Sequence, residues 1–128
     1  MLKIAICDDD LKFAGSLETL VITESQELGI RVETEVFADG KTLVEHIRAG
    51  ERYGLIFLDI EMEHVDGISA ARLIRETDRS VLFIYISGYD SYLKELFEVE
   101  PFRFLSKPLE NKLFCRYYKE ACQRIGET

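Results

Sequence analysis

Residues 2–9 read Leu-Lys-Ile-Ala-Ile-Cys-Asp-Asp, a short apolar run that ends abruptly in two carboxylates. Short apolar runs of this kind are typical of strands buried on both faces of a parallel sheet. Three later runs also end in polar residues: Leu55–Leu58 in Asp59, Val81–Ile86 in Ser87, and Phe102–Ser106 in Lys107-Pro108. Because ligands bind outside the carboxyl ends of parallel strands, the four endings predict one pocket that holds carboxylates, a hydroxyl and an ammonium.

The apolar runs are separated by segments in which apolar residues recur at helical spacing. Repeated strand–helix units favour right-handed crossovers and a parallel sheet covered by helices on both faces. No linker, repeat or low-complexity segment interrupts the chain, which predicts a single domain over residues 1–128. We expect strands at residues 2–7, 31–37 (an edge strand), 55–59, 81–86 and 102–106. We expect helices at residues 11–27, 91–98 and 110–125, one that follows Gly40 and ends near Arg48, and one that begins near Gly67.

The chain has 24 acidic and 16 basic residues and a formal charge of −8, which argues against a nucleic-acid surface because such a surface needs a basic patch. Its longest apolar runs are strand-sized, and the N-terminus opens into a strand rather than a signal peptide. We therefore expect a cytoplasmic protein with no membrane span. The three cysteines lack metal-like spacing, which predicts reduced thiols, with Cys7 in the core.

Three consecutive carboxylates, Asp8, Asp9 and Asp10, follow the first strand. Mg²⁺ prefers oxygen ligands and is commonly held by one or two carboxylates together with water. Two of these carboxylates with Asp59, two strands away, are suited to that cation. The alternative role for each is to cap the following helix, and we assign that role to Asp10.

Asp59 ends the most apolar strand, and a carboxylate there can attack phosphorus to form an acyl phosphate. Lys107 and a metal ion would neutralise the phosphoryl oxygens, and Ser87 would donate a hydrogen bond to one of them. Other phosphate chemistries fit poorly, because the chain has no Walker-type loop and no Gly-x-Gly-x-x-Gly after the first strand. Asp59-Ile60-Glu61 also differs from the Asp-x-Asp pair of aspartate-based phosphatases.

The order and spacing of five motifs resemble the receiver domain of bacterial response regulators, a CheY-like domain, over the whole chain. These motifs are Ile6-Cys7-Asp8-Asp9, Phe57-Leu58-Asp59-Ile60, Asp66-Gly67, Ile86-Ser87-Gly88 and Phe104-Leu105-Ser106-Lys107-Pro108. The segments 59–62 and 102–105 look most like receivers joined to LytTR-type DNA-binding domains. The resemblance implies a flavodoxin-like α/β fold with a five-stranded parallel sheet in the order 2-1-3-4-5 and five helices.

The resemblance also implies a role for individual residues. Asp59 would be the phosphoacceptor, with Ser87 and Lys107 contacting the phosphoryl oxygens. The Mg²⁺ ligands would be Asp8, Asp9, Asp59 and the backbone carbonyl of Glu61. Phe104 would be the aromatic residue that moves inward with Ser87, although a plain core position is the alternative for a phenylalanine. The Lys107–Pro108 peptide bond is expected to be cis.

A receiver is expected to take its phosphoryl group from a sensor histidine kinase. Phosphorylation would change the face formed by the helix at 91–98, the strand at 102–106 and the helix at 110–125. This face would control an output, here a DNA-binding domain. Its apolar and aromatic content also permits a homodimer. Such a protein catalyses its own phosphorylation and dephosphorylation but is not a turnover enzyme. Two alternatives stay open: a receiver-like module that binds partners without phosphorylation, and a small metal-dependent phosphatase or nucleotide-binding enzyme.

Two departures from the family concern the loops around this site. Many receivers have proline where this chain has Glu63, and Glu61 and Tyr89 occupy positions that tune the phosphoryl lifetime in the family.

Overall fold

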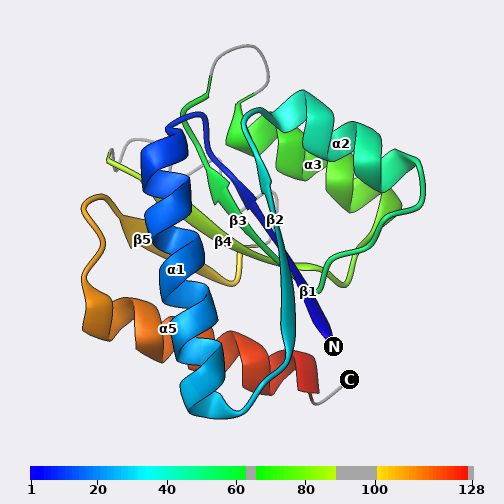
Figure 1. The fold of residues 1–128 in the computed structure, drawn as a ribbon. Coiled ribbons are helices and arrows are strands. Elements are labelled where there is room, and N and C mark those ends of the chain that lie inside the picture. Colours follow the sequence, from blue (N-terminus) through cyan, green and yellow to red (C-terminus); the bar gives the residue numbers. More distant parts are fainter. Residues whose placement is uncertain (63–65, 89–100, 127–128) are drawn as a thin grey trace.

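The computed structural model describes residues 1–62, 66–88 and 101–126 and has a central sheet between two layers of helices (Figure 1). The helices α1 and α5 cover one face of the sheet, and α2 and α3 cover the other (Figure 1). In chain order the elements are β1 (Leu2–Cys7), α1 (Leu11–Leu28), β2 (Val32–Phe37), α2 (Gly40–Arg48), β3 (Leu55–Asp59), α3 (Gly67–Thr77), β4 (Leu82–Ser87), β5 (Arg103–Ser106) and α5 (Asn111–Gly126).

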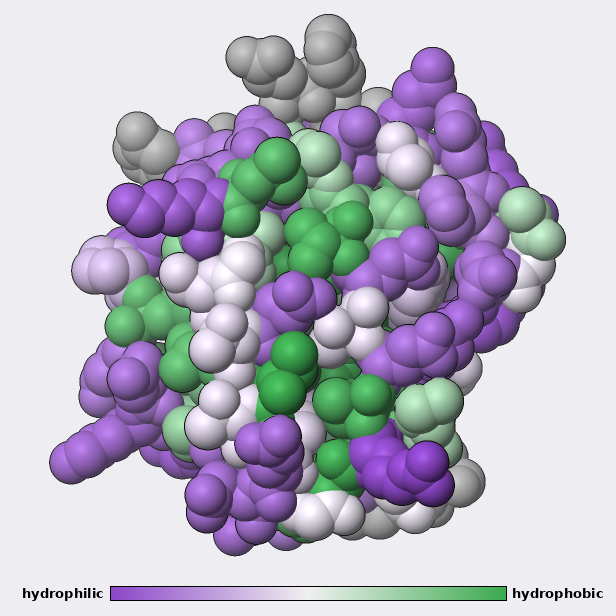
Figure 2. Space-filling view, viewed as in Figure 1, coloured by the Kyte–Doolittle hydropathy of each residue, from purple (hydrophilic) through white to green (hydrophobic). Residues whose placement is uncertain are grey.

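The five strands form one parallel sheet in the order β2-β1-β3-β4-β5, as predicted. The register pairs Cys7 with Leu58, Asp59 with Ile86, and Ser87 with Ser106, so the carboxyl ends of the four strands lie at one edge of the sheet. Every residue of β3 is buried, whereas β2 lies at the sheet edge and is only partly buried. The alternating charges of β2 are therefore explained by its edge position. Figure 2, drawn from the same direction as Figure 1, shows hydrophilic and hydrophobic residues side by side on this face of the molecule.

The elements predicted within the described residues are confirmed with small shifts at their ends. The described residues contain four helices rather than the five expected, because the helix predicted at 91–98 lies outside them. The strand predicted at 81–86 is shifted by one residue, so that Ser87 is its last residue rather than the residue after it. None of the helices in the described ranges is both long and apolar enough to cross a membrane.

Three aspartates begin helices by accepting hydrogen bonds from backbone N–H groups that no helical carbonyl can satisfy. Asp10 accepts from Phe13 at 3.1 Å, Asp39 from Thr42 at 2.7 Å, and Asp66 from Ser69 at 2.8 Å. The predicted capping role of Asp10 is thus confirmed. Each of these helices begins just beyond the carboxyl end of a strand, so the caps help to fix the loops around the predicted pocket.

Apolar side chains form one core cluster on each face of the sheet. The cluster under α1 and α5 contains a stack of Phe57, Phe114 and Tyr118, with the rings of Phe114 and Tyr118 5.7 Å apart and nearly parallel. The cluster under α2 and α3 contains Cys7, which is 1% exposed and confirms the prediction of a core thiol. Burial on both faces holds the ends of β1 and β3 in place.

Candidate functional site

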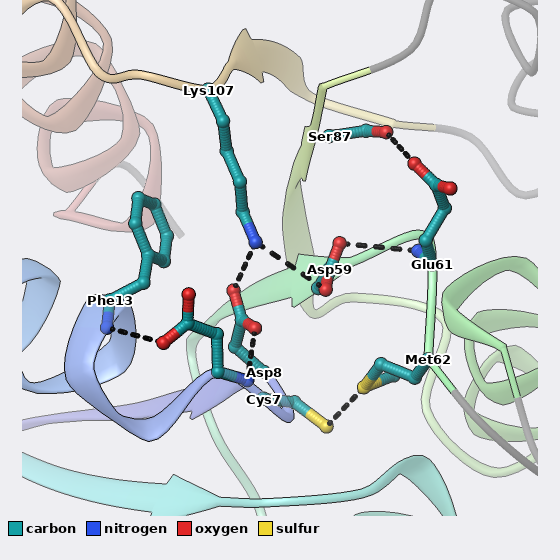
Figure 3. Close-up of polar contacts among 9 residues, drawn as sticks. Cys7, Asp8, Phe13, Asp59, Glu61, Met62, Ser87 and Lys107 are labelled. Atoms are coloured by element: carbon teal, nitrogen blue, oxygen red, sulfur yellow. Dashed lines mark hydrogen bonds and ion pairs between the residues drawn. The ribbon is translucent and has the colours of Figure 1, made fainter.

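Four of the predicted site residues, Asp8, Asp59, Ser87 and Lys107, lie together at the carboxyl edge of the sheet (Figure 3). Asp8 follows β1, Asp59 and Ser87 end β3 and β4, and Lys107 follows β5. Asp8, Asp59 and Ser87 are buried, while Lys107 reaches across the edge toward both carboxylates (Figure 3). The convergence predicted from the strand endings is therefore present.

Asp8 is 2% exposed, and each of its oxygens has a different neighbour. Its Oδ1 accepts a hydrogen bond from the N–H of Asp10 at 2.9 Å, and its Oδ2 lies 3.0 Å from Nζ of Lys107. Apart from this ion pair, the buried Oδ2 has no hydrogen-bond partner within the described residues. A buried carboxylate oxygen with a single counter-charge has room in its coordination for a cation.

Asp59 is 4% exposed, and its carboxylate has two charged neighbours of opposite sign, Asp8 and Lys107. Burial and the nearby Asp8 carboxylate raise the pKa of Asp59 to about 7, against the opposing effect of Lys107, whose Nζ lies 3.6 Å from Oδ2. Its Oδ1 accepts a hydrogen bond from the N–H of Glu61 at 3.2 Å. The site therefore holds more negative charge than its one ammonium neutralises.

Lys107 forms ion pairs with Asp8 and Asp59, and its Nζ lies 4.4 Å from the centre of the Phe13 ring. Hydrogen bonds and the charges of the two aspartates outweigh burial and raise the pKa of Lys107, so the side chain stays an ammonium at neutral pH. The Lys107–Pro108 peptide bond is cis, as predicted. An ammonium held in this way faces the position at which oxygens bound to Asp59 would gain negative charge.

Ser87 and Glu61 interact in a way that the sequence did not predict. The Ser87 hydroxyl, on a residue only 1% exposed, donates a hydrogen bond of 3.0 Å to Oε1 of Glu61 (Figure 3). The Glu61 side chain thus lies on the loop after β3, beside both Asp59 and Ser87. The expected contact of Ser87 with a phosphoryl group requires its hydroxyl to leave the Glu61 carboxylate. The role of the Glu61 backbone carbonyl as a Mg²⁺ ligand stays a prediction.

Phe104 lies in β5 opposite Tyr85 of β4 and is partly buried against the core cluster under α2 and α3. Both the switch role and the core role were predicted for this residue, and its intermediate burial is compatible with either. The hydroxyl of the fully buried Tyr85 has no hydrogen-bond partner in the described part of the chain. Glu63 and Tyr89, the other positions noted for the loops, lie outside the described residues.

The acidic residues fit a divalent cation. One carboxylate oxygen from each of Asp8, Asp9 and Asp59 lies within 4.8 Å of the others. Asp9 is exposed, so the cluster opens to solvent and leaves space for the water ligands that Mg²⁺ commonly keeps. Three carboxylates opposed by one ammonium also carry the surplus charge that a divalent cation neutralises.

Besides the hydrogen bond between Ser87 and Glu61, sequence reasoning missed two structural features of this site. The first is Phe13, treated only as a helix residue, whose ring faces Lys107. The second is the reason for Gly67, at which a Cβ atom would collide with the backbone carbonyl oxygen of Asp59. The Gly67 N–H also donates to the carbonyl of Ile60 at 2.9 Å, so the start of α3 holds the end of β3 in close contact. The Asp66-Gly67 motif indicated that a glycine is important at residue 67, but it did not indicate the contact with the Asp59 backbone.

A parallel sheet in this order, with its site at the carboxyl ends of the strands, is found in flavodoxins and in receiver domains such as CheY. Comparison with protein families matches residues 4–118 to the response regulator receiver domain. The chain therefore belongs to the response regulator receiver family, as its motifs predicted.

Curated relatives of the chain include sensory transduction proteins. The chain is 22% identical over 131 residues to the sensory transduction protein LytT of Bacillus subtilis, covering 100% of this chain and 52% of the relative. It is 29% identical over 112 residues to LytR of Streptococcus agalactiae, covering 87% and 44% of the two chains. These matches support the predicted LytTR-type receiver, and the chain spans about half the length of these relatives.

Solved structures confirm the fold. The response regulatory domain of MrkE from Klebsiella pneumoniae superposes with a TM-score of 0.88 at 22% identity, covering 99% of this chain and 100% of that one. The receiver domain of AraT from Geobacillus stearothermophilus gives 0.84 at 23% identity, covering 98% and 96%.

Proposed function

We propose that this receiver accepts a phosphoryl group on Asp59 in a Mg²⁺-dependent reaction. The observation that carries the proposal is the buried Asp59 carboxylate, which lies beside the Lys107 ammonium and the carboxylates of Asp8 and Asp9. This arrangement supplies a nucleophile, a fixed cation and the ligands for a second cation. These are the parts that phosphoryl transfer through a loose transition state requires.

The chemical step forms a bond between a carboxylate oxygen of Asp59 and phosphorus, while the bond between phosphorus and the donor atom breaks and its electron pair leaves with the donor. Lys107 neutralises charge on the phosphoryl oxygens from a position held by its ion pairs. Mg²⁺, held by Asp8, Asp9, Asp59 and the backbone carbonyl of Glu61, would supply further charge neutralisation at those oxygens. Ser87 would donate its hydroxyl to a phosphoryl oxygen once it has left Glu61.

The proposal is tested by the mass of the intact protein after incubation with acetyl phosphate, with Mg²⁺ or with a chelator. We expect one phosphoryl adduct that depends on Mg²⁺ and is absent in Asp59→Asn. Asp66→Asn is a matched control, because it removes an exposed carboxylate near the site while asparagine caps α3 as well as aspartate does. The control should form the adduct at the wild-type level.

Each other outcome points to a different class of function. An adduct that persists in Asp59→Asn would place the phosphoacceptor elsewhere. Absence of an adduct in the wild type would favour a receiver-like module that binds its partners without phosphorylation. Steady release of phosphate from small esters, at many turnovers per protein, would favour a phosphatase over a domain that only phosphorylates and dephosphorylates itself.

We further propose that the protein is cytoplasmic, that a sensor histidine kinase is its phosphoryl donor, and that a LytTR-type DNA-binding domain is the output of the full protein. The support is family membership together with relatives that are about twice as long as this chain. The switching face would comprise β5, α5 and residues 91–98, of which the last lie outside the described residues. Light scattering with and without acetyl phosphate tests a homodimer through this face, since only a dimer doubles the measured mass.

A further inference from the structure

A second pocket lies at the opposite end of the sheet from Asp59. It has a volume of about 740 Å³ and is lined by residues at or just before the amino ends of β3, β4 and β5 and at the end of α5. Since β3 alone is five residues long, about 15 Å of strand separates the pocket from the acidic site. In Figure 1 the N-terminus and the end of α5 lie near this end of the molecule.

The described residues that line this pocket include four arginines and no acidic residue: Arg75, Arg79, Arg103 and Arg124. They come from α3, the connection after α3, β5 and α5, so the fold rather than a local basic segment brings them together. The whole chain carries a formal charge of −8 and only 16 basic residues. A quarter of its lysines and arginines thus line a single pocket.

Two of these arginines are held in fixed positions by their neighbours. Nη1 of Arg75 donates to the backbone carbonyls of Arg79 at 3.2 Å and Val81 at 2.5 Å, and its guanidinium lies 4.5 Å from the centre of the Phe83 ring. The guanidinium of Arg103 lies 4.4 Å from the centre of the Phe102 ring and binds Glu120 at 2.6 Å. Both guanidinium groups are therefore engaged in contacts within the protein.

Arg79 and Arg124 differ from this pair because they are exposed. Across residues 1–62, 66–88 and 101–126, neither guanidinium forms a hydrogen bond or an ion pair. In a strongly acidic protein, two unpaired arginines beside two fixed ones concentrate positive charge at one pocket. These two are therefore the guanidinium groups available to a ligand.

The lining also includes apolar side chains, among them Val81, Leu82 and Phe102. The volume is within the range of about 300–1,000 Å³ that is usual for small-molecule sites. The planar guanidinium fork matches the oxygens of a phosphate and binds them in pairs. We propose that this pocket binds a small organic phosphate, with Arg79 and Arg124 holding the phosphate and the apolar lining contacting the organic body.

The test is a titration of the ¹⁵N-labelled protein with adenosine 5′-monophosphate and, separately, with inorganic phosphate, followed by amide chemical shifts. A chelator is present throughout, so that no metal can bridge a phosphate to Asp8, Asp9 and Asp59. We expect shifts at residues 79–82 and 102–103, tighter binding of the nucleotide than of inorganic phosphate, and at least tenfold weaker binding to the Arg79→Gln/Arg124→Gln variant. Neither side chain has a structural partner among the described residues, so the variant should keep its fold.

A matched control removes the same charge elsewhere. Arg31 and Arg48 are exposed and lie outside the pocket lining, and the Arg31→Gln/Arg48→Gln variant should bind the nucleotide as the wild type does. Arg79→Lys keeps the charge but removes the fork, so partial loss of binding is expected. The proposal is overturned if neither probe shifts these amides at about 10 mM, if both double variants lose binding equally, or if inorganic phosphate binds as tightly as the nucleotide.

Discussion

At the end of β3, the Asp59 carboxyl has Asp8 and Lys107 as neighbours, and the two act on its pKa in opposite directions. Burial and Asp8 prevail, so the folded protein without metal holds a carboxylate at a position that disfavours its charge. The burial and the neighbouring Asp8 carboxylate that disfavour a negative charge on Asp59 also favour the binding of a cation beside it. Stability and function at this residue therefore oppose one another.

We expect Asp59→Asn to stabilise the metal-free protein. The pKa of Asp59 rises from 3.8 to about 7 on folding, so between these values the folded protein binds a proton that the unfolded chain has lost. The free energy of unfolding contributed by Asp59 thus falls as pH rises through this window. The substitution should add about 2 kcal/mol at pH 8, less than the full shift implies because Asp59 interacts strongly with its charged neighbours.

Urea unfolding in a chelator at pH 4 and pH 8 measures this effect. The gain should vanish at pH 4, where Asp59 is largely neutral in the folded protein. Asp66→Asn is the matched control, because it removes one exposed carboxylate from the same edge of the sheet. A gain of the same size at both would mean that the charge of Asp59 is not the cause.

The side chain of Glu61 is expected to slow the phosphorylation of Asp59. Its carboxylate accepts the Ser87 hydrogen bond beside the site at which a phosphoryl group would add negative charge. Glu61→Gln keeps an acceptor for Ser87 but removes the repulsion, so phosphorylation by acetyl phosphate should be about three- to tenfold faster. Rates are compared at saturating Mg²⁺, and a rate equal to or below that of the wild type would show that the carboxylate does not hinder the reaction.

Among the elements, α3 is fixed to β3 by the contact between Gly67 and the Asp59 backbone. A side chain at residue 67 would force these two elements apart, because the atoms it meets belong to the main chain and have no rotamer to change. The start of α3 and the position of Asp59 are therefore one structural unit.

We expect Gly67→Ala to destabilise the protein by about 2–4 kcal/mol and to slow phosphorylation. Gly15→Ala is the matched control, because a Cβ at this exposed position in α1 meets no atom within 4 Å. Alanine favours the helix there and should stabilise the protein by about 0.5–1 kcal/mol. Thermal unfolding distinguishes the two, and a Gly67→Ala protein as stable as the wild type would contradict the proposed contact.

Over the whole molecule, a buried hydrogen bond joins the first helix to the last. The hydroxyls of Ser25 in α1 and Tyr118 in α5 lie 2.6 Å apart, and Ser25 also donates to the carbonyl of Val21 at 2.6 Å. Ser25 is 1% exposed, so water cannot replace the tyrosine. The two helices on this face are thus linked by a polar contact within an apolar layer.

Tyr118→Phe should lower the free energy of unfolding by about 1 kcal/mol, because the ring stays in the stack while the hydrogen bond is lost. Tyr117→Phe is the control, since its half-buried ring keeps its contact with Arg103. Urea denaturation of both variants measures the difference. Equal stability of Tyr118→Phe and the wild type would mean that the hydrogen bond contributes nothing net.

The element order and most of the acidic site followed from the sequence alone. Apolar runs that end in Asp8, Asp59, Ser87 and Lys107 predicted their convergence, because the carboxyl ends of parallel strands meet at one edge. Asp10 was assigned a capping role, unlike Asp8 and Asp9, because it directly precedes the predicted helix, and the structure confirms that role. These inferences depend on backbone periodicity and strand polarity, which neighbouring residues in the chain encode.

Only the tertiary structure decided the contacts between side chains that are distant in sequence. The hydrogen bond from Ser87 to Glu61 depends on which rotamers the packed loops allow, and the close approach of Gly67 to Asp59 depends on how α3 meets β3. The arginine pocket joins residues from three elements and one connection that share no motif. Such contacts arise from crossovers and packing, so local sequence patterns carry no signal for them.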